Sequence, residues 1–345
     1  MTESIQSVRH CLQEYLATGA PTLLTLEPWG PDLHKRLSEY AERGKMVRGA
    51  LVTFAYRLFD PDGSVPPACC EAGVAMELLQ SFLLIHDDIM DQDDLRRGVP
   101  AVHSQYRELM KSHPGAKQYG LSMGICGGDV AAFLAMERIA TLSVPPELRS
   151  ELSALVAREV VSVGLAQMQD VHHGYVSEVD REAILKVYTY KTGRYTFSLP
   201  LMVGARIAGA SLQQASALAR IGEHLGRIFQ IRDDQLGIFG RSEEIGKPAG
   251  SDIREDKKTI FREELFRTLP QNHVVRSYFG SPLAGEAEME IVRQEIIRTG
   301  VLDRINDLVA EEEQRVNTLV GELEIPPEGV AALNALALYN DTRRT

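Results

Sequence analysis

The stretch that decides the fold of this chain is Asp87-Asp88-Ile89-Met90-Asp91, which follows the almost wholly apolar run 75–85. That run predicts a buried helix, and carboxylates at the end of such a helix are costly unless a cation compensates them. At about 100° per residue, Asp87 and Asp91 share one helical face, roughly 6 Å apart along the axis. Magnesium prefers oxygen ligands and usually bridges one or two carboxylates to the phosphates of a substrate. The stretch therefore predicts a site for a diphosphate and its metal ions.

A second acidic pair, Asp233-Asp234, ends another apolar helical run. Gln230 lies about one turn before this pair, so its amide can point into the same cavity. A single pair of aspartates usually marks a solvated helix end. Two such pairs on two apolar helices argue against that explanation, and we expect both pairs to face one diphosphate.

Basic residues suited to phosphate oxygens form several groups along the chain. They are Lys45 with Arg48 at an expected helix start, Arg96 with Arg97 just after the first acidic stretch, Lys191 with Thr192, and the loop 246–259 with Lys247 and Lys257. Each group alone is typical of a solvated surface. The chain contains neither a Walker phosphate-binding loop nor a convincing hydrolase triad.

The composition indicates one large acidic domain. The chain has 345 residues, of which 44% are hydrophobic, and its formal net charge is -11. Because no linker rich in Pro, Gly or Ser interrupts it, we predict a single domain over residues 1–345. The negative charge argues against nucleic-acid binding and means that an anionic substrate needs local cations or metal.

The four cysteines have neither zinc-ligand spacing nor the pattern of a disulfide framework. They are Cys11, Cys69, Cys70 and Cys126. A reducing, cytoplasmic location fits them. The N-terminus lacks a signal-peptide pattern, and no run of about 18 uninterrupted apolar residues predicts a transmembrane helix.

Helical periodicity recurs through most of the chain, whereas strand signals are scarce. Examples are the segments 152–169, 212–239, 289–301 and 303–323. Breaks rich in Pro and Gly separate about ten or more such segments, so we predict a large all-α bundle.

In this order, the motifs resemble the trans-isoprenyl diphosphate synthases of the polyprenyl synthase family, and most of all the short-chain geranylgeranyl diphosphate synthases. The matching segments are Gly44-Lys45-x-x-Arg48, Asp87-Asp88-x-x-Asp91 with Arg96-Arg97-Gly98-x-Pro100-x-x-His103, Gly127-Gly128-Asp129, Lys191-Thr192, Phe229-Gln230-x-x-Asp233-Asp234 and the lysine loop ending at Thr259. The resemblance implies an all-α fold around a deep central cavity, a homodimer, and Mg²⁺ as cofactor.

The resemblance also implies roles for single residues. Asp87, Asp91 and Asp233 are expected to bind metal, with Asp88 and Asp234 as supporting carboxylates. The allylic diphosphate would be held by Arg96, Lys191, Thr192, Gln230, Lys247 and Lys257, and isopentenyl diphosphate by Lys45, Arg48, Gln80 and Arg97. One departure is Gly237, where the family often has a third aspartate. That loss could weaken one metal or transfer its role to water or to Asp252.

The expected reaction is a 1′-4 condensation in which magnesium and cationic side chains stabilise the departing diphosphate. No enzyme nucleophile is needed. Product length is expected to depend on the helix before Asp87, with Phe82 as a floor for the tail and Leu83, Leu79 and Met76 beside it. An aromatic residue five positions before the motif resembles synthases that make the C20 product, although Phe82 could also be ordinary core.

Other functions stay open at this point. The product could be C15 farnesyl or C25 rather than C20 diphosphate. A class I terpene cyclase ionises similar substrates, but it needs no second-substrate site such as Lys45 with Arg48, and its usual second motif is absent. A non-catalytic subunit of a heteromeric synthase would be expected to lose one acidic cluster, and this chain has both.

Overall fold

The structure is a computed structural model that describes residues 2–240 and 250–342. Its backbone contacts group the chain into two compact units, one formed by 1–157 with 200–215 and the other by 158–199 with 216–345. Both units consist almost wholly of helices, which confirms the predicted all-α class. The single domain over 1–345 stays a prediction, and each unit is described separately below.

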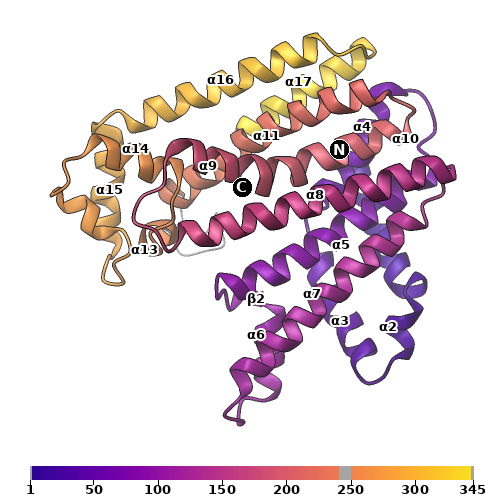
Figure 1. Cartoon of the computed structure of the whole chain (residues 1–345), viewed down its shortest axis with the longest axis horizontal. Coiled ribbons are helices and arrows are strands. Elements are labelled where there is room, and N and C mark those ends of the chain that lie inside the picture. Colours follow the sequence, from indigo (N-terminus) through magenta and orange to yellow (C-terminus); the bar gives the residue numbers. More distant parts are fainter. Residues whose placement is uncertain (1, 241–249, 343–345) are drawn as a thin grey trace. The chain divides into compact units, whose positions relative to one another are not determined.

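The first unit is built around α5 (Pro67–Met90), which packs most extensively against α7 (Ala116–Ala140) and also against α4 (Val47–Phe59) (Figure 1). Proline at the first position favours the start of α5, since proline has no amide hydrogen to lose there. The helix ends where Gln92 adopts a positive φ of 58°. The unit's other helices are α1 (Thr2–Glu14), η1 (Tyr15–Gly19), α2 (Pro21–Thr25), α3 (Trp29–Glu42), α6 (Val102–Leu109), the first part of α8 (Pro146–His173) and α10 (Leu199–Ile207).

Two helices of this unit have the length and hydropathy of membrane spans. In α5, 67% of the most apolar window is buried inside the fold, and in α7 the share is 39%. The burial of α5 is typical of a core helix, because most of its apolar window is covered by protein, whereas less than half of the α7 window is.

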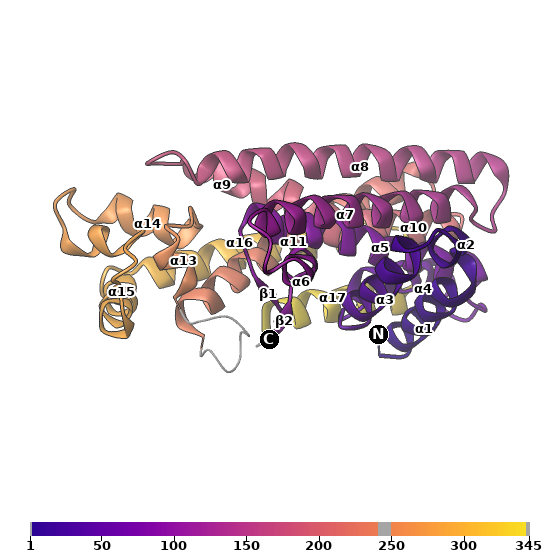
Figure 2. The same ribbon diagram turned by 90° about the horizontal axis from the view of Figure 1, so that it is seen from below.

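A short β-hairpin, which the sequence patterns did not predict, follows α5. Strand β1 (Leu95–Arg96) pairs antiparallel with β2 (Val99–Pro100), and the chain continues directly into α6 (Figure 2). The turn consists of Arg97 and Gly98, whose φ angles of 52° and 75° are both positive. Positive φ at both central residues gives a turn whose twist matches that of the strands, so the hairpin fixes where the two arginines point.

A disulfide between Cys11 and Cys70 joins α1 to the start of α5. The cysteine spacing, which lacks the pattern of a disulfide framework and by itself fits a reducing location, did not predict this bond. Its sulfurs meet because α1 packs against α5, a contact between segments 59 residues apart that spacing alone does not reveal. Cys69 is a buried free thiol, and Cys126 is an exposed one.

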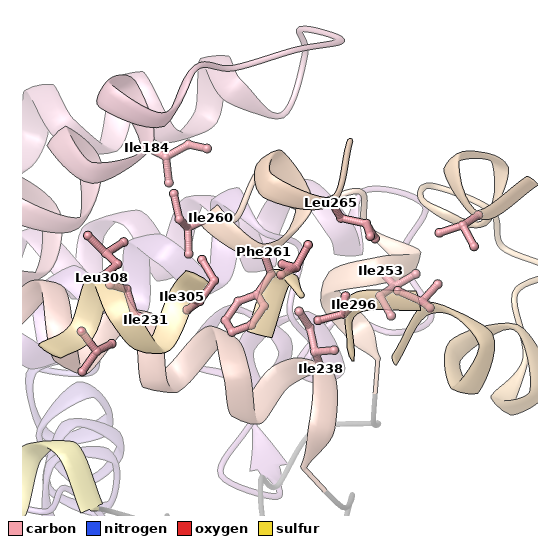
Figure 3. Packing of buried hydrophobic residues seen from close by; sticks show 14 of the residues in the cluster. Ile184, Ile231, Ile238, Ile253, Ile260, Phe261, Leu265, Ile296, Ile305 and Leu308 are labelled. Atoms are coloured by element: carbon pink, nitrogen blue, oxygen red, sulfur yellow. The ribbon is translucent and has the colours of Figure 1, made fainter. Parts of the chain in front are cut away.

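The second unit packs its later helices around a hydrophobic core that includes Ile231 and Phe261 (Figure 3). The large side chains of this core are almost completely removed from water, which is the main stabilising contribution to such a unit. Its elements are the rest of α8, α9 (Arg181–Val187), the π-helix η2 (Tyr188–Ser198), α11 (Leu212–Phe239), α13 (Ser251–Arg254), α14 (Ile260–Thr268), η3 (Val274–Tyr278), α15 (Glu286–Arg298), α16 (Val301–Gly321) and α17 (Pro327–Thr342).

Replacing Cys70 with Ser is expected to lower the free energy of unfolding, because the disulfide closes a loop of 59 residues and restricts the unfolded chain. The chain-entropy relation gives about 4 kcal/mol for such a loop. Urea unfolding with and without reductant measures the effect. Cys126→Ser is the control, and equal midpoints for Cys70→Ser and the wild type would argue against the disulfide.

Candidate active site

Asp87 and Asp91 lie one turn apart at the end of α5, as their spacing predicts. The Asp91 amide donates a hydrogen bond of 2.8 Å to the Asp87 carbonyl. Asp87 is partly buried and Asp91 is exposed. Both carboxylates therefore stand at the solvent-accessible end of a helix whose middle is buried.

Asp88, between them in sequence, has a different environment because it is fully buried. Its carboxylate accepts a hydrogen bond of 3.0 Å from the Tyr40 hydroxyl and one of 2.6 Å from Arg96 Nε. Burial raises the pKa of Asp88, while Arg96 and Tyr40 oppose that rise. Burial also disfavours the charged form of Arg96, but Asp88 outweighs it and raises the pKa of Arg96. The pair fixes the hairpin arginine against α5.

The basic residues Lys45, Arg48 and Arg97 belong to the same unit. α4 begins at Val47, so Lys45 and Arg48 flank a helix start, as predicted. Arg97 reaches solvent, yet partial burial and the nearby guanidinium groups of Arg96 and Arg48 lower its pKa, against the opposite effect of Tyr40. A bound anion would be favourable beside Arg97, because it would relieve the repulsion between these guanidinium groups.

Glu77 is a buried residue that sequence reasoning missed. Its carboxylate accepts a hydrogen bond of 2.8 Å from the Gly49 amide and so joins the start of α4 to α5. Gln80, one turn further along α5, is partly buried and shares the helical face of Asp87. The hydrogen bond between Gly49 and Glu77 therefore fixes the start of α4, which carries Arg48, relative to the face of α5 that carries Gln80.

His86 and the segment Gly127-Gly128-Asp129 pack together. His86 Nε2 lies 3.1 Å from the Ile125 carbonyl and 3.6 Å from the Asp129 carboxylate. A Cβ at Gly128 would meet the His86 ring at 2.4 Å, so only glycine permits this approach of α5 and α7. The Phe82 ring meets His86 edge-on at 4.9 Å. Phe82 therefore lies on the α7 side of α5. Elsewhere along α5, Met76 and Leu79 are fully buried and Leu83 is partly buried.

In the second unit, the Asp233-Asp234 pair again combines an accessible carboxylate with a buried one, as Asp87 and Asp88 do in the first unit. Asp233 is exposed, whereas Asp234 is buried. Asp234 accepts hydrogen bonds from the Tyr188 hydroxyl and, at 3.0 Å, from Gln230 Nε2. Thr192 in turn donates to Gln230 at 2.9 Å. Burial raises the pKa of Asp234 above its ordinary value.

The π-helix η2 brings Tyr188, Lys191 and Thr192 to this pair. π-helical turns are rare and frequently occur at functional sites. Here η2 lies close to α11, because a Cβ at Gly226 would meet the Cα of Gly193 at 2.0 Å. The two glycines allow the backbones to touch, which places Thr192 and Tyr188 within reach of Gln230 and Asp234.

Lys191 and Lys257 each meet a carboxylate in this unit. Lys191 Nζ lies 2.5 Å from Asp170, on α8, and Lys257 Nζ lies 4.0 Å from Asp252. The Lys257 side chain is 48% exposed. Partial loss of hydration lowers its pKa, but Asp252, Asp234 and further aspartates outweigh that effect and raise it. Lys247 lies outside the described residues.

Gly237 stands beside the carboxylate of Asp252. A Cβ at Gly237 would meet Asp252 Oδ2 at 2.7 Å. The Asp252 carboxylate, from α13, thus lies close to where a side chain at position 237 would begin. Asp252 is the residue that the sequence suggested as a substitute.

The carboxylates present fit magnesium. No cluster of three or more metal-binding side chains occurs among the residues that the structure describes. Magnesium does not need one, because it commonly takes one or two carboxylates and completes its shell with water and substrate phosphate. Asp87 and Asp91 at the end of α5, and Asp233 in the last two turns of α11, have carboxylates that solvent or phosphate can reach.

Three further residues of the site were missed from sequence. Tyr40 and Tyr188 donate to the buried aspartates from distant helices, and Asp170 pairs with Lys191. The sequence offered one indication of Asp170, because it directly follows the periodic segment 152–169 and so was expected near the end of a helix. The tyrosines gave none, because nothing in their local sequence marks their long-range contacts.

Comparisons with known proteins agree with this site. The family model for polyprenyl synthetase matches residues 31–296. The chain is 29% identical to the geranylgeranyl diphosphate synthase of Sulfolobus acidocaldarius over 99% of this chain and 97% of the relative. It is 32% identical to the farnesyl diphosphate synthase of Geobacillus stearothermophilus over 75% of this chain and 81% of the relative.

A solved structure is similar over the whole chain. A geranylgeranyl pyrophosphate synthase from Corynebacterium glutamicum, complexed with isoprenyl diphosphate and magnesium, has a TM-score of 0.90 and 27% identity, and the match covers 99% of both chains. The predicted resemblance and the isoprenoid synthase type of all-α fold are thereby confirmed. The chain therefore belongs to the polyprenyl synthetase family and is a prenyltransferase.

Proposed function

We propose that this enzyme is a short-chain trans-prenyl diphosphate synthase that condenses isopentenyl diphosphate with an allylic diphosphate and makes C20 geranylgeranyl diphosphate. The observation that carries the proposal is the paired arrangement at both acidic motifs. Each has a buried aspartate that accepts a hydrogen bond from a tyrosine, and a more accessible aspartate directly before it. The basic residues expected for two diphosphates lie in the same units as these motifs.

Asp87, Asp91 and Asp233 are the proposed ligands of magnesium, which when bound neutralises charge on the departing diphosphate. Arg96, Lys191 and Lys257 donate hydrogen bonds to its oxygens, with Thr192, Gln230 and Lys247 as further contacts. Lys45, Arg48, Gln80 and Arg97 hold isopentenyl diphosphate so that its double bond lies beside the allylic carbon. Binding both substrates in this orientation supplies a large part of the rate acceleration.

The reaction then needs no covalent enzyme intermediate. The allylic carbon–oxygen bond breaks, the electron pair leaves with the diphosphate, and an allylic carbocation remains. The double bond of isopentenyl diphosphate attacks this cation, and the new cation loses a proton to the released diphosphate. Buried apolar walls keep water from quenching the cation.

Two rival functions are less well supported. A terpene cyclase does not require the cation cluster at Lys45, Arg48 and Arg97. A non-catalytic subunit does not require both acidic motifs, and here both keep a buried, hydrogen-bonded aspartate. We also expect the enzyme to act in the cytoplasm, since both substrates are multiply charged and do not cross a bilayer unaided.

Incubation with isopentenyl diphosphate, magnesium and each of the C5, C10 and C15 allylic primers is expected to give a C20 product. Asp87→Asn and Asp233→Asn are each expected to lower kcat by about a hundredfold or more, because each removes a proposed ligand of the magnesium that would neutralise the departing diphosphate. Asp307→Asn, an exposed change on α16, is the control and should not alter kcat. Product sizing by chromatography is the measurement. Absence of elongation with every primer would reject the proposal, and a cyclic hydrocarbon would favour a cyclase.

Product length is proposed to depend on α5. Phe82 lies five residues before Asp87, about 7.5 Å along the axis and about 140° around it, whereas Leu83 and Met76 lie near the Asp87 face. Leu83→Phe is therefore expected to shorten the product, and Phe82→Ala to lengthen it. Phe82→Tyr keeps the ring and should keep the C20 product. An unchanged distribution in Phe82→Ala would assign Phe82 to ordinary core packing with His86.

We propose a homodimer that uses α8. Val161, Leu165 and Met168 are 62%, 62% and 70% exposed and lie along one helical face. An exposed apolar stripe of this kind marks a protein interface. Light scattering of the wild type is expected to give twice the chain mass of 38.2 kDa. For Leu165→Glu, we expect the mass of a single chain. Leu283→Glu, which changes an isolated exposed leucine, should stay dimeric; a monomeric wild type would exclude the interface.

A further inference from the structure

Lys257 lies in a segment whose backbone is held in an unfavourable conformation. The preceding residue, Asp256, has φ 51°, in the left-handed region that favours glycine. A residue with a Cβ keeps this conformation only where its surroundings compensate the strain. The surroundings of Asp256 therefore determine where Lys257 is placed.

Two basic side chains surround Asp256. Arg262 Nε donates to Asp256 Oδ1 at 2.5 Å and Arg262 Nη2 to Oδ2 at 3.2 Å, a bidentate pair. Lys258 Nζ donates to the Asp256 carbonyl at 3.0 Å and also to its carboxylate. The Arg262 side chain is only 8% exposed, so the pair is shielded from competing water.

The Arg262 guanidinium is itself fixed. It stacks 4.1 Å from the centre of the Phe266 ring and donates to the Ser177 carbonyl at 3.2 Å. α14 provides Arg262, and the Thr259 hydroxyl caps the start of that helix. We call the bidentate contact of Arg262 with Asp256 the clamp. Arg262 belongs to a regular, capped helix and not to another loop.

The position of the Lys257 backbone depends on this clamp, because Lys257 directly follows Asp256. Its amide donates to the Asp252 carbonyl at 2.9 Å, and its carbonyl accepts from the Thr259 amide at 2.9 Å. Further on, the Ile260 amide donates to the Tyr188 hydroxyl at 3.0 Å, and that hydroxyl donates to Asp234. The segment 256–260 is therefore held at one end by Arg262 and at the other by the tyrosine of the acidic pair.

We propose that Arg262 is a positioning residue that sets the place of the Lys257 ammonium through Asp256, and so the affinity for the allylic diphosphate. This inference rests on the proposed role of Lys257 in binding that substrate. Arg262 does not touch the diphosphate. Its effect is therefore expected on allylic diphosphate binding and not on isopentenyl diphosphate, whose proposed ligands belong to the other unit.

Arg262→Met is expected to weaken binding of geranyl S-thiolodiphosphate, an unreactive allylic analogue, by about tenfold in the presence of magnesium, the loss typical of one displaced charged hydrogen bond. The KM for isopentenyl diphosphate should stay unchanged. Hydrogen exchange should quicken at the amides of Lys257, Thr259 and Ile260.

The matched control is Arg276→Met. Arg276 lies over the same Phe266 ring at 4.6 Å and donates to the carbonyls of Leu269 and Pro270, but it does not contact Asp256. It should lower stability without changing analogue affinity. In the Arg262→Met background, Asp256→Gly is expected to restore most of the affinity, because glycine adopts the same φ without a clamp.

Equal loss of analogue affinity in Arg262→Met and Arg276→Met, or no recovery with Asp256→Gly, would overturn the positioning role. If Arg262→Met does not fold, Asp256→Asn removes the charged acceptor and is expected to show the same selective loss. Failure of the wild type to bind the analogue or elongate a primer would count against the proposed function. The exchange rates of the Lys257 segment would still test the clamp by itself.

Discussion

The structure depends on the burial of one carboxylate in each acidic motif. An unpaired charge in a protein interior costs several kcal/mol, so a buried aspartate survives only if donors surround it. Asp88 has Tyr40 and Arg96, and Asp234 has Tyr188 and Gln230. The two tyrosine contacts join the aspartates to elements far away in sequence. The more accessible aspartates beside them, Asp87 and Asp233, are thereby fixed on regular helices where we expect metal and phosphate to reach them.

The two motifs solve the same problem in similar ways. The segment 84–91 echoes 230–237 in sequence, and in both the second aspartate of the pair accepts a hydrogen bond from a tyrosine hydroxyl. They differ in the element that carries a basic side chain to the aspartate pair. A hairpin brings Arg96 to the first pair, whereas the clamped loop after α13 brings Lys257 towards the second. The difference at Gly237 is local, since the Asp252 carboxylate lies against that glycine.

Sequence reasoning found the features that depend on local spacing. The all-α class follows from periodicity, and the one-turn spacing of Asp87 and Asp91 follows from helix geometry. It missed features created by tertiary contact: Tyr40, Tyr188, Glu77 and the Cys11–Cys70 disulfide. The hairpin was missed because Arg97-Gly98 is an unusual pair for a two-residue turn. The close approach of η2 and α11 at Gly193 and Gly226 was also missed, because no hydrophobic pattern records it.

We propose that both acidic motifs act on one diphosphate. A double-mutant cycle of Asp87→Asn and Asp233→Asn, read by magnesium-dependent binding of an unreactive allylic diphosphate analogue, tests it most directly. If the motifs share one ligand through its metal ions, each single variant loses most of the affinity, and the double variant loses little more. Independent, additive losses, or full affinity in either single variant, would contradict the account.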